Sequence, residues 1–331
     1  MKFYEINLQL FAYDPQAQPV NHTGSSNLSP EMKTFYDMTL IDEAQANLVH
    51  DQFAQKRPIP KNGGKKIEFR KFDALPKALT ALTEGVTPEG KSLKVTTIEA
   101  EVAQYGDFVT QTDVLELTSL DNTILEATKL LGRQAGLTLD TITRNILHTG
   151  TNVWWAPKGD GTAVTSRAAL DNTCKLTVDV VRRVAAFLKK NNAPKINGDY
   201  VAIIHPYASY DLMSDPEWRY PHQYQDTSNI YEGEIGKIAG VRFVETSEAK
   251  IFDGGVFGTL FLADGAYGVT EITGGGLQTI VKQKGSAGTA DPLDQRSSVG
   301  WKAMKTAEIL VDAYMVRVEH KSTFSGDVQA N

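Results

Sequence analysis

The sequence predicts a mixed α+β fold in which one long helix organises the chain and short strands surround it. From Asp113 to Gly150, apolar residues recur every three or four positions, which is the spacing of a helix with one apolar stripe. Further along, short strand-like and helix-like segments alternate without the strand–helix–strand regularity of a doubly wound sheet. With 331 residues, the chain is long enough to bury a large core and to form two domains.

The long helix is predicted from Asp121 to His148, with Gly150 as its terminator, and would span roughly 40 Å. Gly132 and Gly136 each disfavour a helix by roughly 1 kcal/mol relative to Ala, so we expect another backbone to pack closely there. The stripe consists of Leu117, Leu120, Ile124, Ala127, Leu131, Ala135, Leu139, Ile142 and Ile146.

Before the long helix, the chain begins with a segment that is too poor in apolar residues to form a core. Residues 1–30 combine prolines with Asn, Ser, Gly and Gln, which is typical of an extended arm. Within it, Leu8, Leu10 and Phe11 are expected to dock on another surface. A roughly helical spacing follows from Glu31 to Gln55.

The next segment predicts a long two-stranded ribbon. One strand surrounds Ile67, and the second runs through Ile98 with a phase slip near Thr96 that indicates a bulge. A ribbon of two strands is marginal alone in water, so we expect it to lie on a neighbouring copy of the chain. The interface residues predicted along it are Lys65, Arg70, Phe72, Leu75, Leu79, Leu82 and Glu84.

The remaining elements are shorter and have less regular spacing. We expect a helix from Val178 to Lys190, a buried strand from Tyr200 to Ile204 and a helix opening at Pro206. Further strands are expected at Ile235 to Val244, Thr259 to Leu262, Tyr267 to Thr270, Leu277 to Val281 and, as long strands, within Gly300 to Glu319.

Composition excludes several classes of protein. The net charge is −6 and the pI is about 5.6, which argues against a basic surface that binds phosphate backbones. Cys174 is the single cysteine, so the chain has no internal disulfide and no cysteine-based zinc site. No apolar run approaches the roughly 20 residues that cross a membrane, and we expect a cytosolic product.

The sequence lacks the motifs that are typical of metal, nucleotide and nucleophile sites. The six histidines do not fall at metal-ligand spacing, and the glycine-rich runs at 62–66, 254–258 and 285–288 lack the flanking elements of phosphate, dinucleotide or nucleophile loops. Asp291, Asp294 and Arg296 form a polar cluster, which we expect to pair at a subunit or domain seam. We therefore predict a protein with no catalytic site, no metal and no cofactor.

Four stretches resemble major capsid proteins of tailed double-stranded-DNA bacteriophages. The opening run Asn7 to Ala12 and the segment Thr110 to Gly150 are similar to the family's start and to its spine helix. The run Glu234 to Thr246 resembles a strand–turn–strand signature of the family, and the stretch from Asp291 to Lys302 resembles a closing motif of one sub-family.

The resemblance implies the Hong Kong 97-type capsid fold and a structural role. It implies an N-terminal arm and helix (1–57), an extended β-hairpin loop (58–108), a peripheral domain with the spine helix (109–172), an axial domain (173–298) and C-terminal strands that complete the peripheral domain (299–331).

By the same resemblance, the chain would self-assemble through hexamers and pentamers into an icosahedral head shell around phage DNA, without sequence-specific DNA binding. A scaffolding protein and a portal would be its partners, and it would reside in the host cytoplasm during assembly and then in the virion. Two alternatives remain open: an encapsulin-like nanocompartment shell that holds cargo, and a hydrolase that uses the Asp291–Arg296 cluster.

Overall fold

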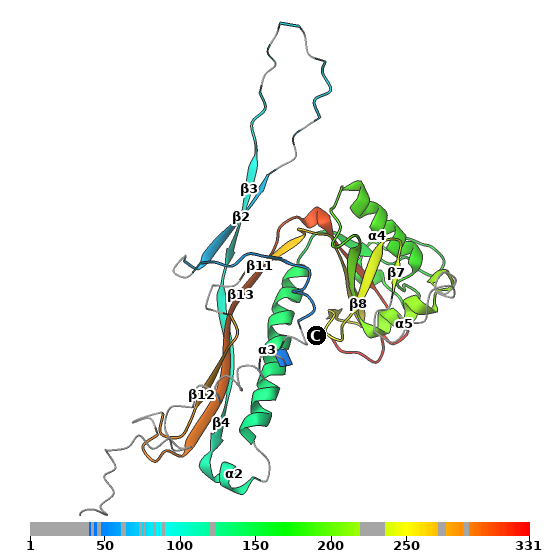
Figure 1. Ribbon diagram of the computed structural model, residues 1–331. Coiled ribbons are helices and arrows are strands. Elements are labelled where there is room, and N and C mark those ends of the chain that lie inside the picture. The colour runs from blue at the N-terminus through cyan, green and yellow to red at the C-terminus, as the bar shows by residue number, and fades with distance from the viewer. Residues whose placement is uncertain are drawn as a thin grey trace, which may run out of the picture.

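The molecule is elongated, with a long sheet backed by one helix, a second sheet to one side and a thin ribbon that projects from the end of the long sheet (Figure 1). The computed structural model describes residues 40, 43–44, 48–60, 64–72, 75, 77–81, 84–85, 87, 90–119, 123–218, 236–270, 276–286 and 291–331. No helix within these ranges is long and apolar enough to cross a membrane.

The first sheet is built on the 14-residue strand β13 (Arg296–Ile309). Its first part pairs antiparallel with β4 (Ala103–Thr112) on one side and with β12 (Gln278–Lys282) on the other. Its last part pairs with β11 (Tyr267–Thr270), which also holds the two-residue parallel strand β1 (Gln55–Lys56). One strand therefore joins every part of this sheet.

Helix α3 (Thr123–Leu147) lies along the first sheet, as the apolar stripe predicts (Figure 1). Alternate β13 residues Val299, Trp301 and Ala303 face the helix because successive strand side chains point to opposite faces. The core between them also contains Leu131, Ala135, Leu139 and Leu40.

The predicted close approach at the helix glycines is confirmed. A Cβ on Gly132 would lie under 3.0 Å from the carbonyl oxygen of Leu40, and one on Gly136 would lie under 3.0 Å from that of Ala44. Leu117, however, was wrongly included in the stripe. It lies on the separate short helix α2 (Asp113–Thr118), where its side chain is 80% exposed.

The second sheet has the strand order β5-β14-β10-β6-β8-β7, with β9 paired to β10. Its strands are β5 (Val153–Trp155), β14 (Met315–His320), β10 (Val256–Leu262), β6 (Tyr200–Ile204), β8 (Val241–Glu245), β7 (Lys237–Ile238) and β9 (Ile251–Phe252). The helical elements α4 (Val178–Lys190), α5 (Pro206–Ser214), η2 (Arg167–Ala169) and η5 (Asp312–Tyr314) accompany them. The continuous apolar runs of β6 and β10 are buried along their whole length, as expected for central strands.

One prediction near the ribbon is corrected. The strands β2 (Lys66–Phe72) and β3 (Val95–Glu101) pair in continuous register, so there is no bulge at Thr96. The irregularity falls instead at the buried Val102, after which β4 joins the first sheet through β13. Residues 103–108 therefore pair with β13 in the first sheet, whereas β2 and β3 pair with each other.

The helix predicted to run to Gln55 ends earlier. Residues 48–54 form turns rather than a helix. The backbone N–H of His50 donates to Asp140 Oδ1 at 2.7 Å, so it does not bond to the carbonyl four residues before it, as a continuing helix requires.

Candidate functional site

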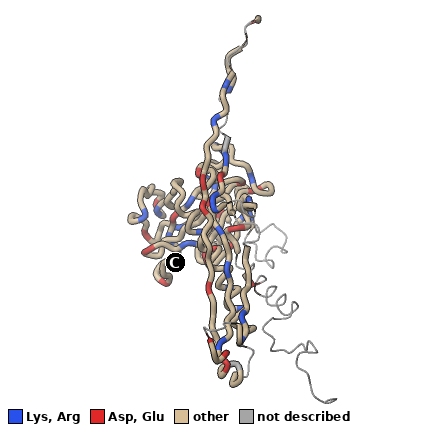
Figure 2. Tube along the Cα trace, turned by 90° about the vertical axis from the view of Figure 1, so that its left-hand side faces the viewer, with Lys and Arg blue, Asp and Glu red and all other residues tan. Residues whose placement is uncertain are grey.

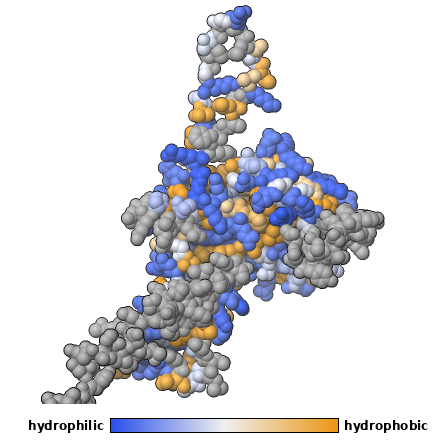
Figure 3. Space-filling model, in the orientation of Figure 1, coloured by the Kyte–Doolittle hydropathy of each residue, from blue (hydrophilic) through white to orange (hydrophobic). Residues whose placement is uncertain are grey.

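The β2–β3 ribbon and the loop beyond it are the most exposed part of the described chain. Every described residue from 75 to 97 is exposed. Leu75, Leu79 and Leu93 are 55%, 87% and 64% exposed, and apolar side chains mark the ribbon in Figure 3. Each leucine stays in water although its burial would be worth roughly 1.5–3 kcal/mol. The projection thus carries apolar surface that its own subunit does not cover.

The base of the ribbon is held firmly to the first sheet. Phe69 is 3% exposed, and its ring packs on Gly268 of β11, where a Cβ would lie 2.9 Å from Phe69 Cε1. The Arg57 guanidinium lies 5.8 Å from the centre of the same ring. Seen edge-on, the ribbon continues the line of the first sheet (Figure 2). The packed end of the ribbon therefore sets the direction of the loop. Lys and Arg residues are spaced along the projection (Figure 2).

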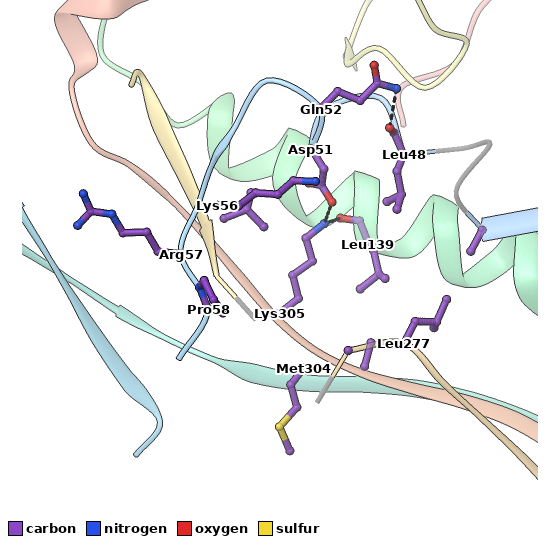
Figure 4. Close-up of a pocket in the computed structure, with 14 residues that line it drawn as sticks. Leu48, Asp51, Gln52, Lys56, Arg57, Pro58, Leu139, Leu277, Met304 and Lys305 are labelled. Carbon is purple, nitrogen blue, oxygen red and sulfur yellow. Dashed lines mark hydrogen bonds and ion pairs between the residues drawn. The ribbon is translucent and has the colours of Figure 1, made fainter. Parts of the chain in front are cut away.

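A buried ion pair anchors the segment that leads into the ribbon (Figure 4). Lys305 of β13 is 2% exposed and donates to the Asp51 carboxylate, and also to the Leu139 carbonyl oxygen at 3.0 Å. The Thr143 hydroxyl donates to Asp51 Oδ1 at 2.7 Å. Because charge in the interior requires a partner, these contacts fix the segment to both helix and sheet.

A second buried pair lies one residue away. Asp140 of α3 accepts from the His50 backbone N–H and lies 2.7 Å from its Nδ1, and the Tyr267 hydroxyl donates to the His50 carbonyl oxygen. Beside the two pairs is a cavity of about 570 Å³. Apolar Leu48 and Leu277 line it along with the polar groups of the anchor. Asp51 and Lys305, which both line this cavity, are engaged with each other, which makes the pair an anchor.

The opposite end of the first sheet forms an apolar tip, which we define as α2 together with the turn at 291–295. Val114, Leu115 and Leu117 of α2 are 62%, 46% and 80% exposed, and Leu293 of the turn is 75% exposed. The Asp113 backbone N–H donates to the Gln295 carbonyl oxygen at 2.9 Å, which joins helix and turn. The tip and the projecting loop thus lie at opposite ends of the molecule (Figure 1).

The polar cluster at Asp291 shapes this turn. Asp291 is 6% exposed, and its Oδ2 accepts from the Arg296 backbone N–H at 2.8 Å, while the Arg296 Nε lies 3.9 Å away. Asp294 adopts φ 51°, a left-handed conformation that Asp tolerates. The carboxylate of Asp291 therefore fixes the turn that carries Leu293, a leucine that no sequence pattern predicts to lie at a contact.

The structure separates the predicted interface residues into two groups. Lys65, Arg70, Leu75, Leu79 and Glu84 are exposed on the projection, and Phe72 pairs with Val95 at the end of the ribbon strands. Asp291, Asp294 and Arg296 lie at the tip. Leu8, Leu10, Phe11 and Leu82 lie outside the described residues.

Within the described ranges, no group of three His, Cys, Asp or Glu side chains could hold a metal ion. Cys174 is buried, and burial raises the pKa of its thiol, which disfavours the reactive thiolate.

Comparisons with known proteins agree with this geometry. The sequence model of the phage capsid protein family matches residues 20–260. A search of the curated proteins found no match.

Among solved structures, the chain is similar to the capsid of Ralstonia phage GP4, with a TM-score of 0.63 and 16% identity over 94% of this chain and 96% of that one. It is also similar to the capsid of cyanophage Pam1, with a TM-score of 0.63 and 14% identity over 94% and 98%. The capsid of cyanophage P-SCSP1u gives a TM-score of 0.62 and 16% identity over 82% and 87%.

Proposed function

Since this chain belongs to the phage capsid protein family and is a structural major capsid protein with the Hong Kong 97-type fold, we propose that its projecting loop and apolar tip are the contacts that close the shell. Its homo-oligomeric capsid is part of the virion. In this proposal each subunit lays residues 64–101 over a neighbouring copy, and the tip packs against the tips of further copies.

The observation that carries the proposal is an apolar loop on a rigid base. Leu75, Leu79 and Leu93 are exposed, whereas Phe69 at the base is buried. A loop aimed in this way loses less conformational entropy on binding than a mobile one, so more of the leucine burial appears as affinity. Individual contacts then contribute a few kcal/mol and add up over a closed lattice.

Further parts of the proposal concern assembly. The shell is icosahedral and is built from hexamers and pentamers, with a scaffolding protein and a portal as partners in the host cytoplasm. The net charge of −6 disfavours tight binding of phosphate, so packaged double-stranded DNA is enclosed without sequence-specific contacts. The work of the chain is geometric, and it carries out no catalytic step.

Deletion of residues 72–90 tests the role of the loop. The variant keeps the buried base of the ribbon, so we expect a folded, soluble subunit that forms no shells in electron microscopy. Normal particles from this variant would refute the loop's role.

A point variant gives a finer test with a matched control. Leu79→Asp places a charge in the proposed contact and is expected to block assembly, whereas Thr80→Asp adds the same charge at the next exposed position without removing an apolar side chain. Circular dichroism should show equal folding of both. If the two variants assemble equally well, Leu79 is not part of the contact.

Leu117→Asp applies the same reasoning to the tip. It should leave unfolding unchanged, because the side chain is 80% exposed, but should reduce the yield of closed particles. A full yield of particles would show that the tip has no role in assembly.

A further inference from the structure

Three buried histidines surround one strand of the second sheet. His148 comes from the end of α3, His205 precedes α5 and His320 ends β14, and all three are at most 9% exposed. Between them runs β10, through its residues Phe257 and Gly258. The cluster therefore lies where the helix of the first sheet meets the second sheet.

His148 is the most isolated of the three. Neither of its ring nitrogens has a hydrogen-bond partner. Its ring is packed so tightly over Gly258 that a Cβ there would lie 2.7 Å from His148 Cε1, and the ring stands edge-on to Phe252 at 5.5 Å between centroids. His148 is 7% exposed, so a proton on the ring would be poorly solvated.

The charged groups that face His148 are cationic. They include Arg317 on β14, Arg144 on its own helix and Lys250 before β9. The Arg317 guanidinium also donates to the His148 carbonyl oxygen. Burial first, and then these positive groups, hold the pKa of His148 well below its usual value.

His205 makes a hydrogen bond that requires an unprotonated ring nitrogen. Its Nδ1 accepts from the Tyr207 backbone N–H at 3.1 Å and so caps the start of α5. A proton on Nδ1 would remove this cap. Its ring lies 5.0 Å from that of Phe257, and burial lowers the pKa of His205.

His320 is fixed by two polar contacts. Its Nδ1 lies 3.0 Å from the Lys321 carbonyl oxygen and so donates, while its Nε2 lies 2.8 Å from the Thr259 hydroxyl and accepts from it. The ring stacks on Phe257 at 6.0 Å. Burial lowers the pKa of His320 to about 4, although the hydrogen bond to the Lys321 carbonyl oxygen and the nearby Asp211 favour the charged form.

We propose that His148, His205 and His320 form an acid-sensitive joint around β10, which holds the end of α3 to the second sheet while the rings are neutral and loosens when they gain protons. A proton on His205 would remove the cap of α5. A proton on His320 Nε2 would turn this nitrogen from an acceptor into a donor towards the Thr259 hydroxyl. A proton on His148 would lie among cations and would have no hydrogen-bond partner. The three changes converge on one strand.

The direction of the pH dependence follows from linkage. Histidine in an unfolded chain titrates near 6.5, and the folded chain holds these rings below that value, so the unfolded state binds more protons in acid. Stability is complete above about pH 6.5 and falls as the pH drops towards the folded pKa values. At pH 5.0 each histidine that stays neutral lowers the folded-to-unfolded ratio about 30-fold relative to pH 7.5.

Urea unfolding of the full-length chain at pH 7.5 and 5.0, with variants, tests the joint. His148→Leu fills the same space with an apolar side chain and loses no hydrogen bond, because neither ring nitrogen of His148 has a partner. His205→Asn keeps a side-chain oxygen that can accept from the Tyr207 backbone N–H. In the original chain the folded-to-unfolded ratio falls between pH 7.5 and pH 5.0. We expect this fall to be about 30-fold smaller in His148→Leu, and to be reduced by a lesser factor in His205→Asn. The same loss in His148→Leu as in the original chain would overturn the proposal.

Hydrogen exchange of the unmodified chain keeps the test independent of variant folding. After correction for the intrinsic pH dependence of exchange, residues 140–147 and β10 should lose protection at pH 5.0 before the first half of α3 does. An unchanged pattern, or a uniform loss of protection along α3, would contradict a joint at this place.

Discussion

Replacing Lys305 by Met tests whether the buried anchor holds the base of the projecting loop. Methionine keeps the apolar stem of the side chain and removes the ammonium, so Asp51 remains buried without its cation. Removing one member of a buried pair costs about 3–5 kcal/mol. Since the Thr143 hydroxyl continues to donate to Asp51, we expect the lower end, about 3 kcal/mol.

The measurement is urea unfolding at pH 7.5, followed by tryptophan fluorescence and circular dichroism. Lys129→Met is the matched control, because it makes the same substitution on α3 in an exposed pair with Glu126 and should cost under about 0.5 kcal/mol. The double variant Lys305→Met with Asp51→Asn should cost less than the sum of its single variants, by about 2 kcal/mol. A loss under about 1 kcal/mol for Lys305→Met, or strict additivity in the double variant, would refute the anchor.

Three further substitutions test the packing. Gly136→Ala gains about 1 kcal/mol of helix preference, but its Cβ would meet the Ala44 backbone, so thermal unfolding should show a net loss of about 1–2 kcal/mol, and a raised Tm would contradict the close contact. Phe69→Ala empties the base of the ribbon and should cost about 3 kcal/mol in urea, with faster proteolysis between residues 64 and 101; unchanged cleavage would argue against a rigid base. Glu319→Gln removes the buried carboxylate that binds Arg167 at 2.5 Å and Arg317 at 3.1 Å, and should lower the free energy of unfolding by about 3 kcal/mol, whereas a change near zero would show that the charge is dispensable.

Periodicity was a reliable guide where one face of an element is buried. The predicted range of α3 differs from the observed one by two residues at its start and one at its end, and α4 and β6 have the predicted bounds. Gly132 and Gly136 also predicted the close backbone correctly, because only a near neighbour explains two glycines on one helix face.

The sequence was a poorer guide where function depends on exposed apolar residues. Leu117 fits the helical spacing of α3, and only the break between α2 and α3 shows that it points into solvent. Leu293 was missed because a single leucine between Pro292 and Asp294 has no periodicity. The anchor was missed for another reason: Asp51 and Lys305 are 254 positions apart, and no local pattern reports a contact between them.

The path of β13 constrains the order in which a newly made chain can mature. This strand completes the first sheet, and the chain then passes through η5 to β14, which forms a central ladder with β10. During translation both sheets therefore remain incomplete until residues 296–320 are made: β4 lacks its partner β13, and β10, which can already pair with β6 and β9, lacks β14. A partly synthesised subunit thus lacks the framework that orients its loop, which delays its entry into a growing particle until synthesis has passed this point.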